Sequence, residues 1–341
     1  MSGMITPGSD WVPLRGIDQR WLSEARLQAH YAVQWLARAA RAYVLPQPDD
    51  EHTNLGWAGA LGGFTTHPLK DDAWLSLRIT DLTLALHVGD GSTHVQSFSL
   101  DGRSDAQAGE WLSEQLGARG LDAHALNAPS PYEMPAHAVS RGAAYGAAGL
   151  TDALAELTAW FGNAEVSLGS IQRQMIGRKF AASPVRCWPH HFDLATLTTL
   201  PTRNTDATGY IGAGFSPGDE YYDEPYFYVS VYPEPDPAAL PSLPMLGHWH
   251  LRDFMAAVAT AHKIVAAKNQ QAETDDFLRG PRSTARSRSS AEAIRETRRG
   301  SFGARESEAS SNYLRRGNSG AIGVSSLFCD PGTSRVSARS Y

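Results

Sequence analysis

The chain has 341 residues, 42% of them hydrophobic and 19% charged, and its formal net charge is −6. This composition excludes a disordered or fibrous protein, and the length is enough for one large domain or two ordinary ones. Residues 1–280 carry 19 Lys and Arg against 31 Asp and Glu, so no nucleic-acid partner is expected for them, because a phosphate backbone attracts basic surfaces.

The expected location is the cytoplasm, without a membrane partner. Cys187 and Cys329 are the two cysteines and lie far apart in the sequence, which does not suit the disulfide framework of a secreted protein. The N-terminal residues lack a signal-peptide pattern, and no apolar run approaches the roughly 20 residues of a membrane-spanning helix. Nothing in the sequence indicates the oligomeric state.

The first α+β half is predicted over residues 20–130, after a flexible N-terminus at residues 1–19. Residues 20–44 repeat apolar side chains every three or four positions, which predicts a helix. A second helix should begin after Ser104 or Asp105 and end at Gly117 or Gly120. The alternating apolar pattern of extended chain predicts strands at 73–79, 82–88, 93–100 and 121–127.

The second α+β half is predicted over residues 131–280. Apolar periodicity predicts helices at 151–161, 167–179 and 251–268, and alternation predicts strands at 208–215 and 225–232. The expected fold class is therefore α+β, with antiparallel sheets packed against helices and a cleft between the halves.

The two halves also resemble each other. Residues 55–79 and 208–232 share an order of glycine, aromatic and acidic positions, and each follows a helix that ends in a Gln-x-x-x-Arg pattern. One hypothesis is that two helix–antiparallel sheet–helix halves arose by duplication. The alternative is that glycine-rich hairpins resemble each other by chance.

Residues 281–341 differ from the rest of the chain. They hold 14 Ser and 11 Arg, no Lys and no sustained periodicity, so a disordered tail is expected. An out-of-frame reading of a GC-rich gene would give the same composition. An Arg/Ser tail that binds RNA is a third interpretation.

Histidine is concentrated in two short segments. His190, His191 and Asp193 lie in WPHHFD, and His248 and His250 lie in GHWH. In extended chain, residues two apart share a face, so His191 would lie beside Asp193, and His248 beside His250. Histidines with a carboxylate are ligands of zinc and non-haem iron, and His191, Asp193, His248 and His250 are accordingly predicted metal ligands.

Two further interpretations of these segments stay open. His190, His191 and Asp193 could form a metal-free acid/base site, joined by Glu220 from the acidic turn SPGDEYYDEP. Alternatively, the imidazoles bond backbone groups and Asp193 caps a short helix over residues 194–200.

A predicted ligand pocket surrounds this cluster. Each Gln-x-x-x-Arg pair shares one helix face, and a buried arginine needs an anionic partner, which could be a small anionic substrate. Aromatic side chains would wall the pocket. The predicted ligand-binding residues are Gln34, Arg38, Gln174, Arg178, Trp188, Tyr226 and Tyr228.

Three blocks carry a family resemblance: SPVRCWPHHFDLATL at 183–197, GAGFSPGDEYYDEPYFYVSVYPEP at 212–235, and LPMLGHWH at 243–250. They resemble the signature blocks of a bacterial family of unknown function, over roughly residues 20–270 of this chain. The resemblance implies one globular cytosolic unit and no particular activity.

The function expected from these observations is a small-molecule enzyme with a His/Asp pocket in the second half. It would depend on a divalent metal, zinc or iron, if the four predicted ligands converge. The alternative is a non-catalytic ligand-binding or structural protein whose polar clusters hold the halves together.

Overall fold

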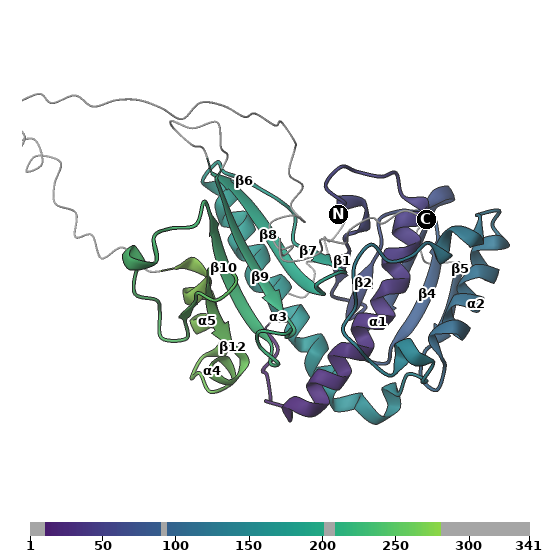
Figure 1. Ribbon diagram of the computed structural model, residues 1–341, viewed down its shortest axis with the longest axis horizontal. Coiled ribbons are helices and arrows are strands. Elements are labelled where there is room, and N and C mark those ends of the chain that lie inside the picture. Colours follow the sequence, from purple (N-terminus) through teal and green to yellow (C-terminus); the bar gives the residue numbers. More distant parts are fainter. Residues whose placement is uncertain (1–10, 90–93, 201–208, 281–341) are drawn as a thin grey trace, which may run out of the picture. The chain divides into compact units, whose positions relative to one another are not determined.

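The computed structural model describes residues 11–89, 94–200 and 209–280 (Figure 1). The predicted tail at 281–341 and the first ten residues of the predicted flexible N-terminus lie outside these ranges. No helix among the described residues is both long and apolar enough to cross a membrane.

Five α-helices and twelve strands make up the described part of the chain. The helices are α1 (Gln19–Tyr43), α2 (Asp105–Gly117), α3 (Thr151–Gly177), α4 (Ala261–Val265) and α5 (Gln270–Arg279). The strands are β1 (Gly56–Ala58), β2 (Gly63–Thr65), β3 (Ala73–Arg78), β4 (Thr83–Val88), β5 (His94–Ser99), β6 (Ala181–Ala182), β7 (Arg186–Trp188), β8 (Asp193–Leu200), β9 (Gly209–Ser216), β10 (Tyr226–Tyr232), β11 (His248–His250) and β12 (Ala256–Thr260).

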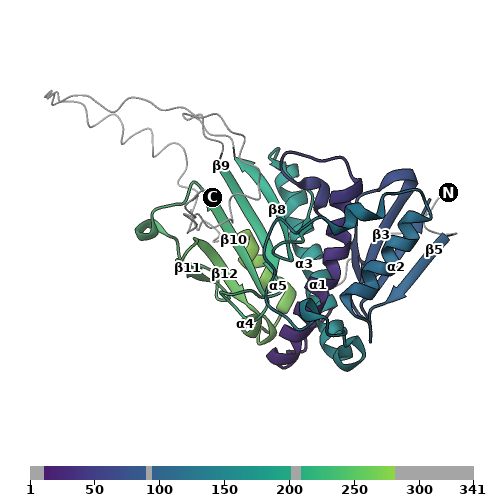
Figure 2. The same ribbon diagram turned by 45° about the vertical axis from the view of Figure 1, so that its right-hand side comes forward.

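These strands form two antiparallel sheets. The first has the order β1-β2-β3-β4-β5, and the second has the order β11-β12-β10-β9-β8-β6, with β7 also paired to β8. Helices α1 and α3 pack against each other between the sheets, with α1 against β3 and α3 against β8 and β9 (Figures 1 and 2). The predicted α+β class with antiparallel sheets is confirmed.

One hydrophobic core joins the two halves. The ring of Phe161 on α3 lies 5.0 Å from that of Phe64 in the first sheet and 5.2 Å from that of Phe215 in the second. Beside this aromatic contact, the backbones of Leu55 and Cys187 exchange two hydrogen bonds of 2.9 Å. The halves are thus tied by side-chain packing and by backbone pairing.

Several helices were predicted correctly from sequence patterns within a single segment. The predicted helix at 20–44 is α1, because its apolar stripe is buried in the core. The Ser104 hydroxyl accepts a hydrogen bond from the Gln107 backbone, which forms a capping box at the start of α2. That helix ends at Gly117, as expected.

The structure differs from the predicted elements in four regions. Residues 151–177 form one helix instead of two, and residues 123–127 form a 3-10 helix instead of part of a strand. The segment 194–200 belongs to strand β8, not to a short helix capped by Asp193. Most of the predicted helix 251–268 is loop or strand β12. The strand is rich in alanine and fully buried between β10 and β11, where small side chains fit. Packing in the sheet therefore outweighs the helix propensity of these alanines.

The duplication hypothesis is not confirmed. Residues 56–65 form a hairpin of two short strands, β1 and β2, at one edge of the first sheet. Residues 209–216, their proposed counterpart, form one unbroken strand inside the second sheet. The glycines also serve different purposes, since a Cβ on Gly63 would overlap the Leu77 carbonyl, whereas a Cβ on Gly214 would overlap the Tyr228 ring.

Candidate functional site

The WPHHFD segment is a tight turn between strands β7 and β8. The backbone N–H groups of His191 and Phe192 bond to the Trp188 carbonyl at 3.2 and 2.8 Å, and Phe192 has a φ of +59°. The alternation rule for extended chain therefore does not apply to His191 and Asp193, because a turn separates the first from the strand that carries the second.

Helix α1 holds this turn through one backbone carbonyl. The Pro189 carbonyl lies 2.8 Å from Gln34 Nε2 and 2.9 Å from His30 Nε2, and since a carbonyl can only accept, His30 carries its proton on Nε2. Burial lowers the pKa of His30 to about 4, so the ring is neutral at pH 7. Gln34, a predicted ligand residue, thus positions the turn.

The two histidines of the turn lie in different environments. His190 packs near the rings of Tyr132 and Trp188. Burial and, to a smaller extent, the neighbouring His191 and His30 together lower its pKa to about 3. His191 is exposed, and its charge favours the ionised form of Asp193. His190 is therefore a neutral imidazole near pH 7, and His191 is the imidazole that solvent reaches.

Asp193 is the most deeply buried group of the predicted cluster. Its Oδ2 accepts a hydrogen bond of 2.6 Å from the Tyr228 hydroxyl, while its Oδ1 is buried and has no hydrogen-bond partner among the described residues. Burial raises the pKa of Asp193, although His191 and the Tyr228 bond act in the opposite direction. The site thus contains a carboxyl group with a raised pKa and one unused oxygen.

A second tyrosine–aspartate pair lies beside the first. Tyr226 and Tyr228 are two apart on β10 and share a face of the second sheet, and the Tyr226 hydroxyl donates a hydrogen bond to Asp219. Asp219 also accepts the backbone N–H groups of Tyr221 and Tyr222 at 2.9 and 3.0 Å. These bonds fix the acidic turn that sequence reasoning had singled out.

Arg26 of α1 faces that acidic turn. Burial lowers the pKa of its guanidinium, and the charges of Asp219, Asp223 and Glu220, in that order, raise it. Its Nε is buried without a hydrogen-bond partner among the described residues. Glu220, a predicted catalytic residue, is exposed and contributes through its charge near Arg26.

The GHWH segment forms a separate cluster around Tyr222. The Tyr222 hydroxyl lies 2.9 Å from both His248 Nε2 and His250 Nδ1, and His250 Nε2 lies 2.6 Å from the Arg252 carbonyl. The Arg252 carbonyl can only accept, so the proton of a neutral His250 ring is on Nε2, and His250 Nδ1 accepts a hydrogen bond from the Tyr222 hydroxyl. The Tyr222 oxygen in turn accepts a hydrogen bond from His248 Nε2. Both histidines therefore contact a tyrosine hydroxyl, whereas the sequence had predicted a metal ion at this position.

The four predicted metal ligands do not converge. Strand β11, with His248 and His250, is four positions from β8 in the sheet, which is about 19 Å at the usual strand spacing of about 4.8 Å. Among the residues that the structure describes, no group of three or more His, Cys, Asp or Glu side chains is placed to hold a metal ion. The sheet order separates segments that the sequence pattern had suggested would meet.

The repeated glutamine–arginine pairs also differ in environment. Arg38 lies 3.8 Å from Asp105 and stacks over Trp35, so its partner is a protein carboxylate. Gln174 is half-buried and Arg178 is exposed at the end of α3. An equal spacing on two helices therefore does not produce two equivalent sites.

Sequence reasoning missed two polar groups of the site, and it also missed a half-buried carboxyl group on α3. Arg26 and His30 precede Gln34 at intervals of four on α1, a helix otherwise rich in alanine and leucine, and this polar row was the signal available. Glu165 on α3 gave no such signal. Burial raises its pKa to about 7, opposed by Arg186 and Arg173, and its Oε2 has no hydrogen-bond partner within the described ranges.

Comparison with known proteins gives one match. A family model, described as a family of unknown function (DUF5996), matches residues 48–285. No curated protein and no solved structure matches the chain.

Proposed function

The chain belongs to the DUF5996 family, whose function is unknown, and we propose that it is a small-molecule enzyme in which Asp193 gives or takes a proton. The observation that carries the proposal is the unused Oδ1 of Asp193, a buried acceptor with no hydrogen-bond partner among the described residues. Buried polar atoms are almost always satisfied, so an unsatisfied one suits a ligand that completes the bond.

The environment of Asp193 suits proton transfer. A carboxyl group with a raised pKa keeps its proton at a higher pH than an ordinary aspartate and can exchange it with a bound molecule. The hydrogen bond from Tyr228 holds the other carboxyl oxygen, which leaves Oδ1 as the reacting atom. Tyr228 is thus a positioning residue in this proposal.

Arg26 supplies the complementary charge. Its guanidinium forms no direct ion pair among the described residues, although three carboxylates of the acidic turn lie nearby. Asp219 influences the pKa of both Arg26 and Asp193, so the two groups border the same turn. A small substrate with a carboxylate or phosphate for Arg26 would bring its remaining atoms toward Asp193.

A structural network is the second candidate, and the burial of the tyrosines favours it. Tyr226 and Tyr228 are only 4% and 7% exposed, so the hydroxyl groups already lie inside the protein. On this view, the two tyrosine–aspartate pairs hold the acidic turn on the sheet without a ligand. Neither candidate requires a metal ion.

The test is incubation of the protein in D2O buffer with a panel of small carboxylates and phosphates, followed by proton NMR. We expect the native protein to remove or create substrate resonances and Asp193→Asn to abolish this change. Arg26→Gln should need a higher substrate concentration than the native protein to reach the same rate of change. Glu114→Gln, on an exposed position of α2, is the control and should behave as the native protein. If native protein and Asp193→Asn both leave every compound unchanged, the structural network is the better account.

A further inference from the structure

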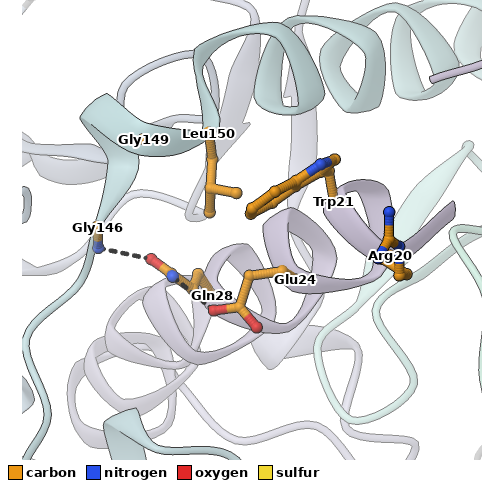
Figure 3. A pocket seen from close by; sticks show the side chains of 7 residues that line it. All are labelled: Arg20, Trp21, Glu24, Gln28, Gly146, Gly149 and Leu150. Atoms are coloured by element: carbon orange, nitrogen blue, oxygen red, sulfur yellow. Dashed lines mark hydrogen bonds between the residues drawn. The ribbon is translucent and has the colours of Figure 1, made fainter. Parts of the chain in front are cut away.

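A cavity of about 480 Å³ lies between the N-terminal half of α1 and the segment that leads into α3 (Figure 3). Its lining residues are Arg20, Trp21, Glu24, Gln28, Gly146, Gly149 and Leu150. Glu24 and Gln28 are two residues away from Arg26, which on a helix is about 200° of rotation. The cavity is therefore on the other side of α1 from the Asp193 site.

The carboxylate of Glu24 is held in place through one oxygen only. Its Oε1 accepts hydrogen bonds from Gln28 Nε2 at 2.8 Å and from His137 Nε2 at 3.1 Å. The backbone N–H of Val139 donates to His137 Nδ1 at 3.2 Å, so the proton of the neutral ring is on Nε2 and points to Glu24. Glu24 Oε2 has no hydrogen-bond partner among the described residues, and the side chain is 39% exposed.

The cation of the lining is paired with a carboxylate other than that of Glu24. Arg20, the basic residue of the lining, bonds to Asp18 through Nε at 3.2 Å and through Nη2 at 2.9 Å. Its charge is thus offset by Asp18, and no ion pair joins Arg20 to the Glu24 carboxylate across the lining. A ligand with a positive charge is favoured and an anion is repelled.

Two large apolar side chains line the cavity beside its polar groups. The indole of Trp21 faces Leu150, with the Glu24 and Gln28 side chains beside them (Figure 3). Trp21 is 55% exposed, although most large aromatic side chains are buried. The face of an indole attracts an organic cation placed over it, and the cavity volume is in the range of small-molecule sites.

We propose that this cavity binds a small molecule that carries a primary ammonium group on an apolar body. The ammonium group donates a hydrogen bond to Glu24 Oε2, the acceptor left open by Gln28 and His137. The apolar body lies between Trp21 and Leu150. A primary ammonium group fits better than a quaternary one because Oε2 requires an N–H donor. This binding site is independent of the reaction proposed at Asp193.

The test is calorimetric titration of the full chain with phenethylamine, with 2-phenylethanol and phenylacetate as neutral and anionic analogues. We expect saturable binding of the amine and none of the two analogues. Glu24→Gln, which keeps the shape and the bonds of Oε1, should weaken binding at least tenfold, as expected for loss of a charged hydrogen bond. Trp21→Ala should also weaken it.

Two controls make the result decisive. Glu114→Gln removes an exposed carboxylate from α2 and should leave amine binding unchanged, as should Asp193→Asn. Because Glu24 is partly exposed, raising the salt concentration should weaken amine binding in the native protein. The proposal is overturned if the native protein does not bind phenethylamine saturably, if the neutral analogue binds equally well, or if Glu24→Gln binds the amine as tightly as the native protein.

Discussion

Tyr228 on strand β10 is paired with Gly214 on the neighbouring strand β9, and the tyrosine ring occupies the space that a side chain at position 214 would need. The two residues are register partners in strands β9 and β10, and a Cβ on Gly214 would overlap the Tyr228 ring and hydroxyl. From this position, the hydroxyl reaches Asp193 on β8 at 2.6 Å. The missing side chain of Gly214 is thus what allows a tyrosine to span from β10 to the buried carboxyl group.

We predict that Gly214→Ala displaces Tyr228 and lowers the free energy of unfolding by about 1–3 kcal/mol, the usual cost of overpacking. Urea denaturation measures this change. The control is Gly212→Ala on the same strand, where the nearest atom to the new Cβ is the Ser230 hydroxyl oxygen at 2.8 Å, which can rotate away. An equal loss in both variants would show that Tyr228 is not the cause.

Glu165 should make stability fall as pH rises. Its pKa is about 7 in the folded protein, above the ordinary value of 4.5, so the folded state holds the proton more tightly than the unfolded state. Stability is then lost between about pH 4.5 and pH 7, by up to about 3 kcal/mol for this difference in pKa. Glu165→Gln should be more stable than the native protein at pH 8 and similar to it at pH 4.

The measurement is the free energy of unfolding of both proteins across this pH range. Glu114→Gln on α2 is exposed and serves as the matched control, because loss of its charge should not change the slope. If the free energy of unfolding changed equally with pH in the native protein and in Glu165→Gln, the role assigned to Glu165 would be wrong.

His190 should have the opposite effect on acid stability. Its pKa is lowered from 6.5 to about 3, so the unfolded state takes up the proton first, and stability is lost as pH falls below about 6.5. His190→Phe keeps a ring near Tyr132 and Trp188 and cannot be protonated. We expect its thermal midpoint to fall less than that of the native protein between pH 6.5 and pH 4; an identical fall would contradict the burial argument.

The hydroxyl of Tyr222 should contribute to the stability of the second sheet. Tyr222→Phe leaves His248 and His250 without the oxygen that both contact at 2.9 Å. We expect a loss of about 1 kcal/mol in urea denaturation, a typical value for a partly buried hydrogen bond. Tyr232→Phe, at a residue that is 44% exposed, should cost less, and equal costs would assign no special role to the histidine pair.

Metal uptake should not depend on His248. Its Nε2 has a tyrosine partner, and Asp193 lies on a strand four positions away. We expect His248→Ala and the native protein to hold equal amounts of zinc and iron after dialysis, measured by mass spectrometry. A loss of stoichiometric metal in the variant would restore the metal interpretation of the GHWH segment.

Predictions from local pattern succeeded where one segment contains its own signal. The apolar stripe of α1 and the Ser104 cap of α2 depend on residues three or four apart, so they could be identified without knowledge of the rest of the chain. Strand β12 could not, because its alanines favour a helix in isolation and become a strand only between β10 and β11.

The candidate site, like the fold, was predictable from the sequence only in part. The sequence was sufficient to single out Asp193, Tyr226 and Tyr228 as site candidates, because polar groups among aromatic residues need partners. Which partners they have was decided by strand order and by the approach of α1, which bring Arg26 to the acidic turn and His30 to the WPHHFD turn. The same strand order keeps His248 from Asp193, since backbone pairing spaces strands at about 4.8 Å whatever side chains they carry.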